Sequence, residues 1–143
     1  MLGELLKKIE STRAGFGVAI LRIVIGGIFF KAGSGKLFGW FGGLGISGAT
    51  EFFQSLNIPH PAFSAVFVGC TELLGGLCLI VGFLTRLVSI PLAITMITAI
   101  LTAHRDGEFY YPLVILCGLI ALMDTGGGWP SLGRWISQKD DDI

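Results

Sequence analysis

The sequence predicts an all-α fold, a four-helix transmembrane bundle with a short interfacial or re-entrant helix between the first and second spans. Hydrophobic residues make up 52% of the 143-residue chain and charged residues only 14%, whereas an ordinary soluble domain carries about 25% charged residues. About 20 apolar residues are enough for a helix to cross a hydrocarbon core of ~30 Å. Apolar runs of about that length, with few charges, cover 14–38, 62–84, 87–103 and 110–124. We therefore expect one membrane domain that contacts lipid along most of its length.

The first span, 14–38, is apolar apart from Arg22, Lys31 and Lys36. A cleaved signal peptide is the alternative interpretation, because small residues follow the apolar run. Two cations interrupt the run, however, and the apolar region of a signal peptide is normally about 7–15 residues long. A membrane span is the better interpretation.

The segment between the first two spans is rich in Gly and Pro at both ends and carries apolar residues at helical spacing over Ala49–Leu56. We expect a short helix there, in the plane of the membrane. Phe52, Phe53 and Leu56 would face lipid or the bundle, while Glu51 and Gln54 would face water.

The remaining spans follow in quick succession. Glu72 is the single charge in 62–84, and Thr85 and Arg86 are expected to form a tight turn before 87–103. The last run, 110–124, is short, and its two leading tyrosines would anchor it at the membrane interface. The acidic tail over about 137–143 is expected to be disordered.

Glycine is abundant, with 22 copies scattered through the apolar runs. Small residues let transmembrane backbones approach closely, because lipid provides no hydrophobic drive for helix association. Gly26 and Gly33 on the first span, and Gly69 and Gly76 on the second, are predicted to be helix-packing positions.

Charges inside the membrane are the main candidates for function, since they cost at least ~2.5–3.5 kcal/mol each and usually face a partner. Arg22, Gly26, Phe29, Gly33 and Lys36 recur at steps of four and three, which places them on one helix face. Lys31 falls on the opposite face.

Glu72 lies about ten residues into its span, near the midplane, and Arg22 is expected at a similar depth. We therefore predict an Arg22–Glu72 ion pair. Two interpretations stay open: a structural ion pair that fixes helix register, or a ligand or proton site that uses the same two residues.

Other polar residues have weaker claims. An opening on the outer side of the bundle could be lined by His104, Lys36 and His60. His104 and His60 also fit ordinary positions in the membrane interface or a loop. Thr95, Thr98 and Thr102 fall on one stripe of the third span and are interpreted mostly as packing residues.

Several classes of function lack support in the sequence. The formal net charge is zero, so there is no basic field to attract nucleic acid. Cys70, Cys78 and Cys117 form no C-x-x-C pair and no close Cys/His spacing, so we predict no metal site and no haem site. Whether the chain is itself an enzyme stays open.

A set of motifs nevertheless resembles the DoxX-like family of four-helix membrane proteins. The matching elements extend from Leu21 to about Leu132 and are LR, G-x-x-K, GG, F-F-x-S-L-x-x-P, E-x-x-G-G and L-T-R. They match Leu21 and Arg22, Gly33 and Lys36, Gly42 and Gly43, Phe52 to Pro59, Glu72 to Gly76, and Leu84 to Arg86. The sequence departs from the family pattern at Lys31 and in its closing GGGWPSLGRW segment.

The resemblance implies a bacterial inner-membrane protein linked to redox metabolism, as a subunit or accessory of a quinone-linked or oxidative-stress system. If the chain is catalytic, it would be an oxidoreductase subunit of a quinone-linked complex. A quinone is then the expected ligand, with no covalent cofactor. A non-catalytic anchor or assembly partner for a soluble enzyme is the alternative, a small-molecule transporter is a third, and a protein partner or homo-oligomer is expected.

The distribution of Lys and Arg predicts the orientation. Six lie on the side of the two termini and two on the other side, namely Lys7, Lys8, Arg13, Arg86, Arg134 and Lys139 against Lys36 and Arg105. Both termini are therefore expected in the cytoplasm. A reporter enzyme that is active only in the periplasm should be inactive when fused to the C-terminus, and activity there would contradict the orientation.

Overall fold

The computed structural model describes residues 1–4, 15–103, 107–128, 135–136 and 139. Within these ranges the principal elements are helical, and they confirm the predicted fold class. In chain order they are α2 (Phe16–Phe38), the 3₁₀ turn η1 (Trp40–Gly42), α3 (Gly45–Ser55), α4 (Pro61–Val81), α5 (Thr85–Thr102) and α6 (Tyr110–Thr125). The predicted disordered tail lies, apart from Lys139, outside the described residues, and so does His104.

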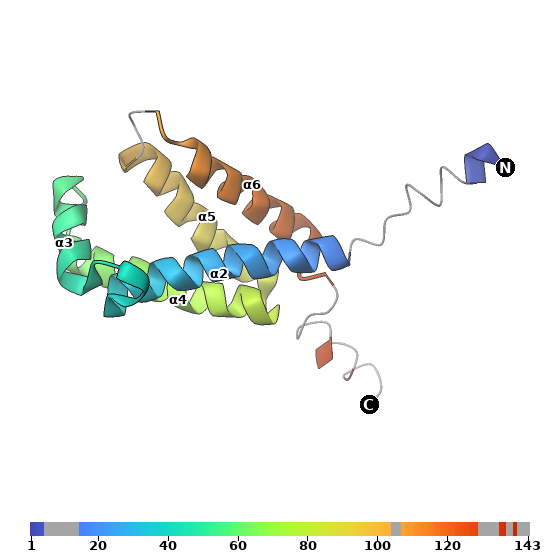
Figure 1. The fold of residues 1–143 in the computed structure, drawn as a ribbon, viewed down its shortest axis with the longest axis horizontal. Helices are drawn as coiled ribbons and strands as arrows, with labels where there is room; N and C mark the ends of the chain where they lie inside the picture. Colours follow the sequence, from blue (N-terminus) through green and yellow to red (C-terminus); the bar gives the residue numbers. More distant parts are fainter. Residues whose placement is uncertain (5–14, 104–106, 129–134, 137–138, 140–143) are drawn as a thin grey trace.

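The four long helices form two pairs (Figure 1). α2 lies alongside α4, and α5 lies alongside α6. The pairs meet near the end of the bundle where α2 begins and α6 ends, and they diverge toward the other end. The short helix α3 lies crosswise at that diverging end, beside the end of α2 and the start of α4.

Glycines hold α2 against α4 at backbone distance. A Cβ atom added to Gly26 would lie 2.8 Å from the carbonyl oxygen of Gly76, and one added to Gly33 would lie 2.7 Å from that of Gly69. Neither space admits a side chain. The four predicted packing glycines therefore form one antiparallel contact, as expected for helices that associate in lipid.

Two separate cores stabilise the fold. The larger one lies where the two helix pairs meet and contains Phe29, Leu79, Leu92 and Leu119, all nearly inaccessible. The smaller one lies under α3, where Ala49 and Phe53 pack on Ala65 of α4. Since Phe53 is buried while Glu51 and Gln54 are exposed, the amphipathic reading of this segment is confirmed.

The helix lengths agree with membrane spans. α2, α4 and α5 are each long and apolar enough to cross a bilayer, and α6 is a shorter apolar helix. The turn between α4 and α5 comes earlier than the sequence predicts, because α4 ends at Val81, where Gly82 adopts a left-handed conformation with φ of 80° and terminates the helix. Thr85 and Arg86, predicted as the turn, are instead the first residues of α5.

Gly33→Ala should destabilise the protein by about 1–3 kcal/mol, the usual cost of overpacking a tight contact, because its methyl group would meet the α4 backbone. The matched control is Gly27→Ala, since a Cβ at Gly27 has no neighbour within 4 Å. Thermal unfolding in mild detergent measures both. Equal midpoints for the two variants would show that the α2–α4 contact is looser than the structure has it.

Candidate functional site

An ion pair joins the two helices of the glycine contact near the diverging end of the bundle. The Nζ atom of Lys36, in the last turn of α2, donates a hydrogen bond of 2.6 Å to Oε2 of Glu72 in the middle of α4. The Glu72 side chain is 5% exposed and that of Lys36 is 26% exposed. The pair is therefore largely withdrawn from the surroundings, and its open side is that of the ammonium group.

The helix register explains this pairing. Gly33 of α2 faces Gly69 and Leu73 of α4, so Glu72 lies at the level of the last turns of α2. Lys36 follows Gly33 by three residues and projects on the same helix face. The predicted Arg22–Glu72 ion pair is consequently wrong, because Arg22 lies fourteen positions before Lys36, about 21 Å along the helix at 1.5 Å per residue.

Arg22 has a different position and a different partner. It lies near the start of α2, 2% exposed, and its Nη1 atom donates a hydrogen bond of 2.7 Å to the carbonyl oxygen of Gly127, just after α6 ends. This contact fixes the end of α6 against the start of α2. The two charges that the sequence suggested as one site therefore lie in different parts of the bundle and have different partners.

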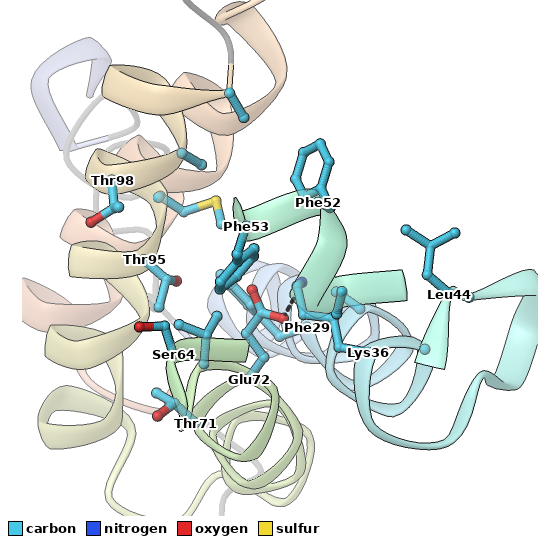
Figure 2. Close-up of a pocket in the computed structure, with 18 of the residues that line it drawn as sticks. Phe29, Lys36, Leu44, Phe52, Phe53, Ser64, Thr71, Glu72, Thr95 and Thr98 are labelled. Carbon is cyan, nitrogen blue, oxygen red and sulfur yellow. Dashed lines mark hydrogen bonds and ion pairs between the residues drawn. The ribbon is translucent and has the colours of Figure 1, made fainter. Parts of the chain in front are cut away.

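A large pocket opens beside the Lys36–Glu72 pair, between the diverging helix pairs (Figure 2). Its volume is about 1000 Å³, and α2, η1, α3, α4, α5 and α6 all contribute to its wall. Most of the wall is apolar and includes Phe29, Trp40 and Phe53. Largely apolar pockets with a few convergent polar groups are the usual form of a small-molecule site.

Hydroxyl groups form a second polar feature of the wall. Thr95, Thr98 and Thr102 of α5 line the pocket, so the stripe interpreted as packing lies on the candidate site instead. In Figure 2, Ser64, Thr71 and Thr95 lie on the other side of Glu72 from Lys36. The spacing of the threonines was visible in the sequence, but the neighbour that would face them was not.

The remaining candidates are distributed as follows. Lys31 is exposed and lines the edge of the pocket, although the sequence separated it from the functional face. His60 caps the start of α4, is exposed and does not belong to the pocket wall. Within the described ranges, no group of three or more His, Cys, Asp or Glu is placed to hold a metal ion.

The arrangement provides a hydrogen-bond donor to a lipophilic molecule. An ammonium group carries three N–H donors, and the structure uses one of them for Glu72. The others remain available to an acceptor that enters the pocket. Glu72, paired but close by, can accept a hydrogen bond or hold a proton, so the site suits a molecule with a carbonyl or hydroxyl oxygen on an apolar frame.

Comparisons with known proteins identify relatives but no solved structure. The DoxX family model matches residues 17–105. The chain is 31% identical to "Putative oxidoreductase CatD" of Bacillus subtilis (strain 168), over 84% of this chain and 87% of that protein. It is 30% identical to "Inner membrane protein YqjF" of Escherichia coli (strain K12), over 94% of this chain and 99% of that protein. It is 31% identical to "Uncharacterized membrane protein Rv3486" of Mycobacterium tuberculosis (strain ATCC 25618 / H37Rv), over 85% of this chain and 82% of that protein. No solved structure matches the chain.

Removing one member of the Lys36–Glu72 pair should destabilise the protein, by up to about 3–5 kcal/mol for a fully buried pair. Lys36→Met should cost more than Glu72→Gln, because Glu72 stays buried without its cation, whereas the Lys36 side chain can extend toward a polar surface. The double variant K36M/E72L should recover much of the loss. Unfolding midpoints in detergent, taken as a double-mutant cycle, measure the coupling, and strictly additive effects would show that the two side chains do not interact.

Proposed function

The chain belongs to the DoxX family, and we propose that it binds a quinone beside Lys36 and Glu72, as the membrane component of a redox system in the bacterial inner membrane. The observation that carries the proposal is the largely buried ion pair, with Nζ and Oε2 2.6 Å apart, in the wall of a largely apolar pocket of about 1000 Å³. Charges at membrane depth are costly and usually serve a ligand, an ion path or a proton path.

The residues of the pocket fit the chemistry of a quinone. Lys36 would donate a hydrogen bond to a carbonyl oxygen through an N–H that Glu72 does not use. Phe29 and Phe53 would pack against the apolar ring. A quinone supplies reversible acceptance of two electrons and two protons when bound, and Glu72 is placed to hold or release a proton near Lys36.

The electrons for such a system would come from a soluble oxidoreductase at the membrane. One relative carries the name "Putative oxidoreductase CatD" and another is named an inner membrane protein, and these names support the redox setting and the location. The proposal gives this chain the binding of the quinone and the handling of protons near it. It assigns the transfer of electrons to the partner enzyme.

The proposal predicts that quinone co-purifies with the wild-type protein in mild detergent. Lipid extraction and mass spectrometry should find the quinone in wild-type protein and lose most of it in Glu72→Gln and Lys36→Met, because both variants disrupt the polar end of the site. The matched control is Glu51→Gln, which removes an exposed carboxylate on α3 outside the pocket wall and should retain the quinone.

Two other outcomes would contradict the proposal. Wild-type protein without any bound small molecule, but with a stoichiometric soluble enzyme, would favour an anchor. Equal quinone content in the wild type and all three variants would show that the quinone is bound nonspecifically at the protein surface together with lipid.

A further inference from the structure

We infer that the ligand of this site carries a long hydrocarbon tail and that the tail leaves the pocket sideways, between α4 and α5, into the acyl chains of the membrane. The inference rests on the proposed function and specifies its substrate class, a quinone with a polyprenyl or comparable tail. The exit is called here the α4/α5 slot. Its residues are Ser64, Phe67 and Thr71 on α4, and Ile94, Thr95 and Thr98 on α5.

The pocket is larger than the ring of a quinone requires. A cavity of about 150 Å³ already holds a benzene molecule, whereas this pocket measures about 1000 Å³. A substituted quinone ring at Lys36 would leave most of that space unfilled. Because the polar groups of the ion pair lie on one wall, the rest of the volume is suited to a hydrocarbon chain.

The α4/α5 slot connects the pocket to the outer surface of the bundle. Phe67 and Ile94 both line the pocket and yet are 61% and 58% exposed, so each lies at an edge. Both belong to helices long and apolar enough to span a bilayer, so this edge faces acyl chains. α4 also packs far less extensively on α5 than on α2, which leaves the slot open toward the diverging end.

The hydroxyls of the slot are compatible with a hydrocarbon tail. Thr71 donates to the Phe67 carbonyl at 2.8 Å, and Thr98 donates to the Ile94 carbonyl at 2.9 Å. Thr95 and Ser64 are bonded to their own helix or its approach in the same way. The hydroxyl donor of each of these side chains is therefore already used within the protein, so a hydrocarbon tail would leave none of them unpaired.

The opposite edge of the pocket, between α2 and α6, is less suitable for a tail. Lys31 and Tyr111 line the pocket there, and both are exposed. A hydrocarbon chain that left on this side would pass the Lys31 ammonium group. Within the described part of the chain, the α4/α5 slot contains no charged side chain.

Quenching of Trp40 fluorescence can report on binding, because Trp40 lines the pocket. The chain has three tryptophans, so replacing Trp129 and Trp135 by Phe leaves Trp40 as the single reporter. The probes are 2,3-dimethoxy-5-methyl-1,4-benzoquinone, which has no tail, and its 6-decyl derivative, which has the same ring and a ten-carbon tail. For each probe, the affinity of a variant is divided by that of the parent protein. The two probes partition differently into detergent, and this ratio removes that difference.

Thr98→Phe, which narrows the α4/α5 slot, should weaken binding of the decyl quinone at least tenfold, the equivalent of about two buried methylene groups. Binding of the tailless quinone should change less than about twofold, because the variant leaves the ion pair intact. Ala32→Phe is the matched control on the α2 wall of the pocket. It should not weaken binding of the decyl quinone more than binding of the tailless quinone.

The outcomes separate this inference from the proposed function. If both quinones bind and Thr98→Phe affects them equally, or if Ala32→Phe selectively weakens the decyl quinone, the slot is overturned while quinone binding stands. If neither quinone quenches Trp40 in the parent protein, the proposed function itself fails.

Discussion

The backbone contact between α2 and α4 determines where every charge in this membrane domain lies. Gly26 and Gly33 meet Gly76 and Gly69 so closely that no side chain fits between the helices. The contact admits one register only, because a shift along either helix would bring a Cβ atom against a backbone. That register brings Lys36 beside Glu72, and it leaves Arg22 nearer the start of α2, beside the end of α6.

Arg22 and Lys36, two cations of α2, are stabilised in different ways. Arg22 gives a hydrogen bond to the Gly127 carbonyl and thereby ties the end of α6 to the start of α2. Lys36 neutralises Glu72 while keeping one quarter of its side chain open. A charge that is only partly enclosed, beside a large apolar pocket, retains the capacity to bind a further group. The candidate site therefore lies toward the end of the bundle where α3 lies.

The pocket exists because the two helix pairs pack tightly at one end only. The larger core fills the space where they meet, and the smaller core under α3 fills the outer corner between α3 and α4. The pocket lies between the helix pairs, where α4 packs less extensively on α5 than on α2. The same divergence that forms the pocket would also open it to the surrounding lipid along the proposed slot, so the pocket and its proposed access have a single structural cause.

The sequence alone determined the helices, because each depends on local composition. Long apolar runs and an amphipathic segment at α3 are properties of neighbouring residues, and the helix faces of Arg22, Gly26, Phe29, Gly33 and Lys36 follow from helical periodicity. Only the tertiary structure decided which carboxylate meets which cation, since depth counted along each helix does not reveal the stagger between them. It also decided that Thr95 and Thr98 face a pocket, because a hydroxyl stripe looks the same whether a helix or an open space lies opposite. Partners across a helix interface depend on register, and register here is set by four glycines acting together, a relation between distant segments that no local pattern contains.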